Sequence, residues 1–330
     1  MEQGLAAVAD RLARAASLLV VCHARPDGDA LGSIVALAHS ARLAGKTATM
    51  LVPDRIGPQY DFLFDSDRPA PRDQFAALAD QADLTVIVDT SAFAQLDGLK
   101  EHIEARRDKV VVIDHHKTAG EVGQVQWVDV SAAAAALMVQ EMLEHLKWPM
   151  DQRVVHALGV GITSDTGWLK FESTDARCLN AMARLVNAGL KLDQLHRELF
   201  QNDRPERLKL VGRALQSLEL LNGGALAVMT LRQADFEAAG ARQDETENMV
   251  NEALRIRTVE VVAMLVELGE VVRASLRSRQ HVDMAAVAQR MGGGGHARAA
   301  GLRSTLPFEQ VHQQVVDACL DAIREQRPKE

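Results

Sequence analysis

The sequence predicts an α/β protein: an N-terminal, mainly parallel sheet flanked by helices, then a smaller C-terminal α+β domain, with a cleft between the two. Its 330 residues suffice for about two domains at roughly 150 residues each. Up to about residue 190, short apolar runs alternate with segments of helical period, which is typical of parallel strands joined by crossover helices. From about residue 223, two long β-type runs separated by one glycine indicate a hairpin.

The first domain is predicted to contain five strands, each a short apolar run rich in Val, Ile and Leu. They are Ser17–Cys22, Thr47–Val52, Leu84–Asp89, Lys109–Asp114 and Gln124–Val128. Hydrophobic periodicity and end signals predict helices over Ala30–Ala44, which closes at Gly45, over Ser131–Leu146, with Ser131 as its N-cap, and over Gln152–Thr163, Asp175–Ala188 and Leu192–Phe200.

We expect the first domain to span residues 1–200, a connecting helix to span 201–222 and the second domain to span 223–330. The predicted elements of the second domain are, in chain order, a strand over Ala225–Leu231, a helix pair, hairpin strands over Val259–Leu268 and Glu270–Arg279, a helix over Asp283–Met291, the glycine run Gly292–Gly295 and a helix over Pro307–Arg324.

Composition and charge limit the class of partner. Lys and Arg total 37 and Asp and Glu total 45, so the net charge of 37 − 45 = −8 argues against binding long duplex nucleic acid through bulk positive charge. No stretch approaches the roughly 20 apolar residues that span a bilayer, and the N-terminus lacks a signal-peptide pattern, so no membrane association is expected. The cysteines Cys22, Cys178 and Cys319 form no CxxC motif, which favours a reducing cytoplasm.

Four polar segments contain candidate metal ligands. The first, HARPDGDALGS, follows a predicted buried strand and precedes a helix, the place where open α/β sheets bind ligands. Its His23, Asp27 and Asp29 provide one imidazole and two carboxylates, a set that suits Mn²⁺ and Mg²⁺. The alternative is a Pro-Asp-Gly-Asp turn in which Asp29 caps the helix.

The other three segments follow two strands and a helix. Asp89 ends LTVIVD, where the alternative role is a helix cap. Asp114, His115 and His116 end KVVVIDHH, and three consecutive titratable groups at a strand end are hard to justify by packing, which favours a site over a solvated loop. Asp165 lies in GVGITSDTGWLKF, where the alternative is a C-terminal helix cap.

Shared position favours one site. Three of these segments lie at the same end of predicted parallel strands, so the fold would gather them at one sheet edge. Four Asp and two His could hold two divalent cations with one carboxylate shared between them. Two cations about 3.5–4 Å apart can activate a water and stabilise a leaving oxygen, as phosphoester hydrolysis requires.

A second candidate region lies in the C-terminal domain. In VVRASLRSRQ, period-two spacing places Arg273, Ser275, Arg277 and Arg279 on one face of a strand, and arginine suits paired hydrogen bonds to phosphate. In MGGGGHARAAG, the glycines would let backbone N–H groups converge on an anion. The alternatives are a solvated strand face and a flexible linker, and neither P-loop nor dinucleotide spacing is present.

These motifs resemble those of the DHH phosphoesterase superfamily with its DHH-associated C-terminal domain. The resemblance implies that one Mn²⁺ is held by His23, Asp27 and Asp89, and the other by Asp29, Asp89, His115 and Asp165. It further implies that His116 contacts the scissile phosphate and that Asp114 supports it. Mg²⁺ or Co²⁺ are the alternative cations. In the C-terminal domain, it implies that the substrate is held by Ser275, Arg277, Arg279, Gly293, Gly294, Gly295, His296 and Arg298. The chain departs from the family pattern at Leu169, where members often carry Phe.

Within the superfamily, the chain resembles the oligoribonuclease and phosphoadenosine-phosphate phosphatase branch. The resemblance implies a cytoplasmic, metal-dependent hydrolase acting on very short RNA, on linear dinucleotides such as pApA and pGpG, and on 3′-phosphoadenosine 5′-phosphate. Two alternatives stay open: a soluble cyclic-dinucleotide phosphodiesterase, and a non-catalytic nucleotide sensor on the same scaffold. A homodimer is compatible with these expectations.

Overall fold

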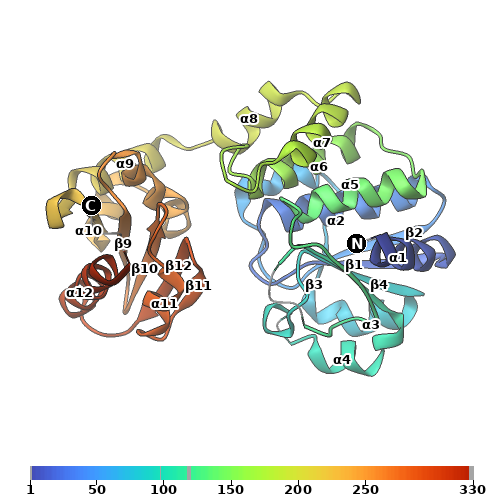
Figure 1. Cartoon of the computed structure of the whole chain (residues 1–330), viewed down its shortest axis with the longest axis horizontal. Helices are drawn as coiled ribbons and strands as arrows, with labels where there is room; N and C mark the ends of the chain where they lie inside the picture. The colour runs from blue at the N-terminus through green and yellow to red at the C-terminus, as the bar shows by residue number, and fades with distance from the viewer. Residues whose placement is uncertain (1, 97, 117–119, 327–330) are drawn as a thin grey trace. The chain divides into compact units, whose positions relative to one another are not determined.

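The computed structural model describes residues 2–96, 98–116 and 120–326, which form two units, Met1–Asn202 and Asp203–Glu330 (Figure 1). Each unit contains one six-stranded sheet, parallel in unit 1 and mixed in unit 2, so the predicted fold class is confirmed. Within the described ranges, no helix has the length and apolar composition needed to cross a membrane. The cleft between the domains stays a prediction.

The sheet of unit 1 has the order β3-β2-β1-β4-β5-β6. The five predicted strands are confirmed to within one residue at each end, and the short edge strand β3 is an addition. Their runs of Val, Ile and Leu are buried because helices cover both faces of the sheet. The strands are β1 (Ser17–Val21), β2 (Thr47–Val52), β3 (Ala70–Pro71), β4 (Leu84–Val88), β5 (Val110–Asp114) and β6 (Val125–Val128).

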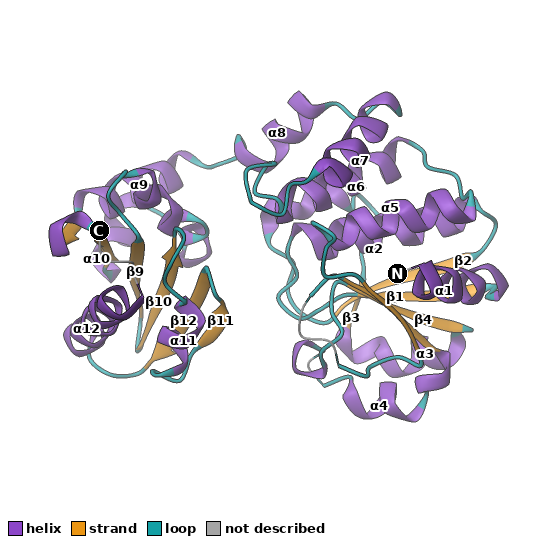
Figure 2. Ribbon diagram, in the orientation of Figure 1, coloured by secondary structure: helices purple, strands orange, loops and turns teal. Residues whose placement is uncertain are grey.

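Two helical layers enclose this sheet (Figure 2). One layer contains α1 (Glu2–Arg14), α2 (Gly28–Leu43), α5 (Ala135–Leu146) and α6 (Gln152–Asp165), and the other contains α3 (Phe75–Gln81) and α4 (Lys100–Ala105). Both α7 (Ala176–Asn187) and α8 (Leu192–Phe200) pack against α6. The prediction did not include α1, α3 or α4.

Strand order predicts a ligand site at the carboxyl ends of β1 and β4. The chain winds outward from β1 through β2 to β3, and then returns to place β4 on the other side of β1. Connections leaving neighbouring strands in opposite directions open a crevice at their carboxyl ends, where doubly wound sheets bind ligands. His23 follows β1 by two residues and Asp89 directly follows β4, so both lie at this switch point.

A close contact between α2 and α6 positions the site. A Cβ atom at Gly32 would lie only 2.4 Å from the carbonyl oxygen of Ala157, so this contact needs glycine. At Gly161, a Cβ atom would lie 3.0 Å from Oδ1 of Asp29 and 2.3 Å from the Cβ of Ala136. The absent side chains therefore leave room for the Asp29 carboxylate between α6 and α5.

The predicted start of α5 is wrong. Ser131 is not its N-cap: the helix begins at Ala135, and the Ser131 N–H and hydroxyl donate to Asp129 Oδ1 instead. The first turn is capped by Asp29, whose Oδ2 and Oδ1 accept hydrogen bonds from the N–H groups of Ala135 (2.6 Å) and Ala136 (2.8 Å). A cap supplied from 106 positions away leaves no local signal in the sequence.

The sheet of unit 2 has the order β11-β12-β10-β9-β8-β7, with β8 and β9 parallel and the other pairs antiparallel. The predicted hairpin is β9 and β10. The strands are β7 (Glu219–Leu221), β8 (Leu226–Leu231), β9 (Val261–Leu268), β10 (Val271–Ser278), β11 (Gly294–His296) and β12 (Ala299–Ser304), and the helices are α9 (Pro205–Gln216), α10 (Gln233–Ala239), α11 (Met284–Gln289) and α12 (Phe308–Gln326).

Four segments of unit 2 differ from the prediction, and two of them are the strands β7 and β12, which it did not include. Only one helix, α10, follows β8, and two short 3₁₀ turns, Gln243–Thr246 and Met249–Arg255, take the place of the second helix of the predicted pair. The glycine run does not stay a loop but enters β11, which pairs with β12. Gly295 has a φ of 144°, and a Cβ there would lie 2.5 Å from the Ala299 carbonyl oxygen, so the hairpin itself requires glycine.

The two faces of this sheet are covered unequally. One face packs on α11 and α12 along β8, β9, β10 and β12. On the other face, the apolar core formed with α9, α10 and the 3₁₀ turns contains strand residues of β8 and β9 only, and the turn Met249–Arg255 also contacts β10. On that second face, β10 and β12 carry polar and small residues rather than core residues, as the alternating burial of β10 shows. We call this part of the sheet, formed by β10, β12 and β11, the open face.

Candidate metal centre and arginine face

The first predicted segment turns from β1 into α2. Asp27 is the N-cap of α2, because its Oδ1 accepts from the N–H groups of Asp29 (3.0 Å) and Ala30 (3.1 Å). Asp29 therefore is not the N-cap of this helix. His23 Nε2 lies 4.0 Å from Asp27 Oδ1, so the capping carboxylate also borders the imidazole.

Asp89 lies at the centre of the candidate site. It is only 1% exposed and has a φ of 61°, a left-handed conformation that Asp tolerates better than most residues. Its Oδ2 lies 3.3 Å from His23 Nε2, and its Oδ1 lies 3.4 Å from His115 Nε2. No helix starts at Asp89, so the capping alternative does not apply. Oδ1 is buried and accepts no hydrogen bond, as an oxygen reserved for a cation would.

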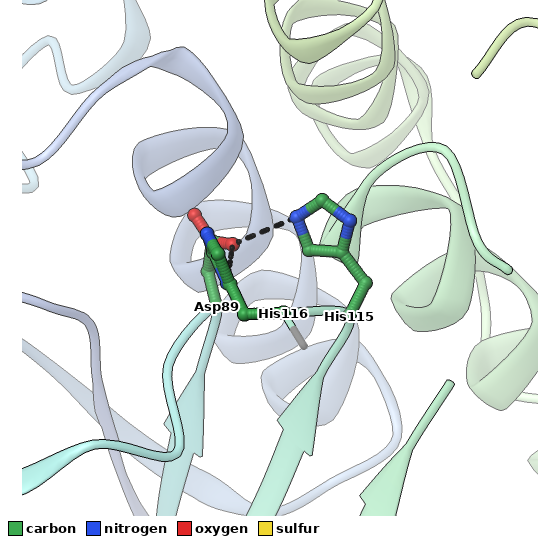
Figure 3. Close-up of side chains that lie close together, drawn as sticks. All are labelled: Asp89, His115 and His116. Carbon is green, nitrogen blue, oxygen red and sulfur yellow. Dashed lines mark ion pairs between the residues drawn. The ribbon is translucent and has the colours of Figure 1, made fainter. Parts of the chain in front are cut away.

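His115 and His116 approach Asp89 from the end of β5. Figure 3 shows the ion-pair contacts of both imidazoles with the Asp89 carboxylate, at 3.4 Å for His115 Nε2 and 3.7 Å for His116 Nδ1. His115 Nε2 also lies 3.8 Å from Asp29 Oδ2 and 3.5 Å from Asp165 Oδ2. The imidazole of His115 thus borders three carboxylates.

In each candidate histidine ligand, Nδ1 has a backbone carbonyl oxygen as its hydrogen-bond partner. Nδ1 of His23 is 2.8 Å from the Ala24 carbonyl oxygen, and Nδ1 of His115 is 3.1 Å from the Ala132 carbonyl oxygen. A carbonyl can only accept, so Nδ1 donates its proton and the lone pair is left on Nε2, which faces the carboxylates. Metal-binding histidines are oriented in this way.

His116 has a different partner. Its Nδ1 lies 2.8 Å from Oδ1 of Asp114, whose Oδ2 accepts a hydrogen bond from the Ser91 hydroxyl at 2.6 Å. Asp114 is completely buried, so this carboxylate is held by the protein and does not face solvent. The prediction did not identify Ser91, and a lone serine two residues after Asp89 carries no distinguishing signal.

Asp165 is the last residue of α6, and the chain turns sharply after it. Gly167, Trp168 and Leu169 have φ values of 55°, 62° and 61°, so three consecutive residues are left-handed. Such a conformation costs about 1–2 kcal/mol for each non-glycine residue. The turn follows a carboxylate that lies 3.5 Å from His115 Nε2, so the strained segment borders the candidate site.

The electrostatics of this cluster favour positive charge at its centre. Burial would lower the pKa values of His23 and His115, but the surrounding carboxylates outweigh it and raise them to about 9 and about 10. Burial raises the pKa of Asp165 to about 6 and also raises that of Asp29. For Asp89, burial would raise the pKa, but the neighbouring His115 and His23 outweigh burial and hold the pKa below its usual range. Protons therefore occupy the place where cations would neutralise these acids.

All six predicted ligand residues meet in this region. Together with His116, these residues form three groups whose spacing could hold a metal ion: His23, Asp27 and Asp89; Asp29, His115 and Asp165; and Asp89, His115 and His116. Two of these groups contain Asp89, and each of its oxygens faces a different histidine. The donors are carboxylates and imidazoles, which suit Mn²⁺ and related divalent cations.

The predicted phosphate-binding residues of unit 2 are placed less uniformly. Arg277 lies on the open face, and within the described residues it has no ion pair; its Nη1 donates only to the Leu276 carbonyl oxygen. Burial lowers its pKa. Arg279 follows the end of β10 and donates to the carbonyl oxygens of Leu254 and Ile256, and Arg298 donates to that of Val282, so both guanidinium groups have structural partners.

Pairing register relates the remaining predicted residues to Arg277. In one row, Arg277 pairs with Ala299, which pairs with His296. In the next row, Ser275 pairs with Gly301, which pairs with Gly294. Gly295 pairs with Ala300 in β12, and a Cβ at Gly293 would lie 2.3 Å from the Gly301 carbonyl oxygen. The predicted residues of β10 and β11 therefore lie two strands apart in one sheet.

Comparison with known families identifies both units. Residues 17–162 match the DHH family, N-terminal domain, and residues 223–326 match the DHHA1 domain. The chain is 29% identical over 314 residues to the bifunctional oligoribonuclease and PAP phosphatase NrnA of Thermus thermophilus, covering 94% of this chain and 90% of that protein. It is 26% identical over 282 residues to the NrnA of Bacillus subtilis, covering 84% and 86%.

Solved structures share the fold. An exopolyphosphatase-related protein from Bacteroides fragilis matches with a TM-score of 0.91 at 21% identity, covering 98% of this chain and 96% of that chain. Exonuclease RecJ bound to manganese matches with a TM-score of 0.56 at 15% identity, again covering 98% and 96%. At these identities, the structural similarity supports a shared fold and nothing more specific.

Proposed function

The chain belongs to the DHH family and carries a DHHA1 domain, and from that membership we propose that this metal-dependent phosphoesterase hydrolyses very short oligoribonucleotides, linear dinucleotides such as pApA and pGpG, and 3′-phosphoadenosine 5′-phosphate. The relatives named above are oligoribonucleases and PAP phosphatases, so neither the cyclic-dinucleotide hydrolase nor the nucleotide sensor is favoured. Homodimerisation and a cytoplasmic location stay predictions.

One observation carries the proposal: the buried carboxylate of Asp89 lies between two histidines, with an oxygen that accepts no hydrogen bond. An unsatisfied buried carboxylate oxygen is costly unless a cation uses it. We assign His23, Asp27 and Asp89 to one divalent cation, and Asp29, Asp89, His115 and Asp165 to a second. The imidazole ligands favour Mn²⁺ over Mg²⁺, with Co²⁺ as a further candidate.

When bound, two divalent cations supply Lewis-acid chemistry that activates water and stabilises the leaving oxygen. The chain contributes the rest. Asp114 holds the His116 Nδ1 proton, and we assign Nε2 of the same ring to the scissile phosphate. The same hydrogen bond raises the pKa of His116, which burial partly offsets, and so favours the imidazolium form. A cationic donor there would stabilise charge that develops on phosphate oxygens.

We expect Arg277→Ala to weaken substrate binding rather than chemistry. Its guanidinium has no carboxylate partner in the described residues, so it is available for a substrate phosphate. Loss of one hydrogen bond to a charged group, about 1.5–3 kcal/mol, should raise KM for pApA by about 10–100-fold with kcat changed only a few-fold. Steady-state kinetics with Mn²⁺ measure both constants. Arg290→Ala, an exposed arginine paired with Glu325, is the control. A fall in kcat without a change in KM would contradict this role.

A product time course tests the proposed function. With Mn²⁺, the protein is incubated with pApA, a pentaribonucleotide, 3′-phosphoadenosine 5′-phosphate, cyclic di-AMP and pyrophosphate. We expect mononucleotides from the first two, adenosine monophosphate from the third and no turnover of the last two. Asp89→Asn protein purified in parallel controls for contaminating nucleases. Turnover of cyclic di-AMP or pyrophosphate alone would refute the proposal.

Without metal, the stability of unit 1 should fall as the pH rises. The pKa values of His23 and His115 in the folded protein, about 9 and about 10, exceed their ordinary value of about 6.5. Their stabilisation is therefore complete below pH 6.5 and is lost as the pH rises through 9 to 10. In EDTA, Tm should drop between pH 7 and pH 9.5 by at least about 4 °C, since 1 kcal/mol shifts Tm by about 2–4 °C in a domain of this size.

The control for this measurement is the same pH series with saturating Mg²⁺, measured by differential scanning fluorimetry. A divalent cation takes over the role of the two protons, so the drop should be smaller in its presence. Equal drops with and without Mg²⁺ would contradict the assignment of these histidines to a cation site.

A further inference from the structure

Two arginines face each other at one end of the open face. Arg273 of β10 pairs directly with Arg303 of β12 in the antiparallel register. Like charges in directly opposed positions of a sheet repel and destabilise it. An anion bound between the two guanidiniums would offset this repulsion.

Neither arginine is neutralised by an ion pair in the described part of the chain. Arg303 is exposed, and its guanidinium has no hydrogen bond or ion pair with the residues that the structure describes. Arg273 donates from Nη2 to the Thr246 hydroxyl, while its Nε is buried without a hydrogen-bond partner. Burial and the charge of Arg303 lower the pKa of Arg273, and the carboxylate that counteracts them is Glu247. Glu247 offsets this effect only in part, because the net shift of the Arg273 pKa is downward.

Between this pair and Arg277, the open face has residues with small side chains or none. The intervening row contains Ser275, Gly301 and Gly294, which add only one hydroxyl side chain. A Cβ at Gly294 would meet no atom within 4 Å, so the space above it is open. Arg273 and Arg277 are four residues apart on one face, about 14 Å at roughly 3.4 Å per residue. The small side chains of this row therefore leave room at Gly294 for a substrate strand that crosses the row between Arg277 and the pair.

We propose that Arg273 and Arg303 form a second phosphate site, which binds the backbone of an oligoribonucleotide beyond the nucleotide held at Arg277. The inference rests on the proposed function. The spacing exceeds the step between neighbouring phosphates of a nucleic-acid strand, so a phosphate further along the oligomer reaches the pair. A dinucleotide has no phosphate beyond the one next to the phosphate at Arg277, so we expect it not to occupy this second site. Two guanidiniums suit the oxygens of one phosphate because each offers a planar set of donors.

Binding without hydrolysis tests this site. In EDTA, isothermal titration calorimetry measures the Kd of the full-length protein for pApA and for a 5′-phosphorylated pentaadenylate. The wild type should bind the pentamer more tightly than the dimer. Arg303→Ala, an exposed position, should raise the Kd of the pentamer by about tenfold or more, the loss expected for a charge-assisted hydrogen bond, and leave the dimer within about twofold. It should also reduce the salt dependence of pentamer binding, with a slope smaller by about 0.7.

Two further variants serve as a control and as a test of the charge. Arg290→Ala removes an exposed arginine of the same unit that pairs with Glu325, and should change neither Kd. Arg303→Lys keeps the charge and should recover part of the pentamer affinity. Equal wild-type affinities for pentamer and dimer, or equal losses for both in Arg303→Ala, would overturn the second site. These binding results do not depend on turnover, whereas the product time course tests the catalytic proposal separately.

Discussion

Replacing Asp89 with asparagine is expected to lower kcat on pApA by more than about 10³-fold, beyond the 10²–10³-fold typical for loss of one transition-state donor. Asparagine keeps the size of the side chain but has a single oxygen and no charge. In the wild type, His23 and His115 lie 3.3 and 3.4 Å from the two Asp89 oxygens. Asparagine cannot present a carboxylate oxygen to both histidines. Both proposed cation sites should therefore weaken together.

Metal content and kinetics measure this outcome. Mass spectrometry of metals should find about two Mn²⁺ per wild-type chain and fewer in Asp89→Asn. Asp83→Asn is the matched control, because Asp83 is an exposed aspartate at the amino end of the same sheet, where it accepts from the N–H groups of Ala16 and Ser17. Near-normal Mn²⁺-dependent turnover by Asp89→Asn would refute the shared ligand.

The meeting of the six candidate ligands could be predicted from the sequence because it follows from topology. Parallel strands end at the same sheet edge, so His23, Asp89 and His115, each close to a strand end, had to lie near one another. Asp165 was harder to place, because it ends a helix, and only the close contact of α2 with α6 brings it to the same point.

Partners of these residues could not be predicted, because they involve the backbone or distant segments. Carbonyl groups of Ala24 and Ala132 orient His23 and His115, and every residue has a carbonyl group. Asp29 has two possible functions: it caps α5 through Ala135 and Ala136, and it borders His115. The predicted N-cap at Ser131 failed for this reason.

The glycine run shows the same limit in unit 2. Its composition indicated an anion-binding loop, but Gly293 and Gly295 are required by close backbone approach in the β11–β12 hairpin. Composition cannot separate a glycine that contacts a ligand from one that permits a turn, because both need a missing Cβ. The polar alternation of β10 was the more informative signal, since period two alone predicts which residues share a face.

Asp114→Asn is expected to lower kcat by about 10²–10⁴-fold while leaving metal content unchanged, by analogy with triads in which loss of the carboxylate puts the histidine in the wrong tautomer. Asp114 Oδ1 accepts a hydrogen bond from His116 Nδ1, with 2.8 Å between the two atoms, and Asp114 Oδ2 accepts one from the Ser91 hydroxyl. An asparagine can turn its amide N–H₂ toward Nδ1, which moves the proton to Nε2 and removes the charge that favours imidazolium.

A purely structural role for Asp114 predicts a different pattern. Because Asp114 raises the pKa of His116, its loss should move the basic limb of the kcat pH profile to lower pH, whereas misfolding would lower kcat equally at every pH. Ser91→Ala should give a smaller shift in the same direction, since it leaves the carboxylate charge but removes one hydrogen bond that positions it. An unshifted pH profile in Asp114→Asn, with two Mn²⁺ still bound, would mean that His116 acts without this partner.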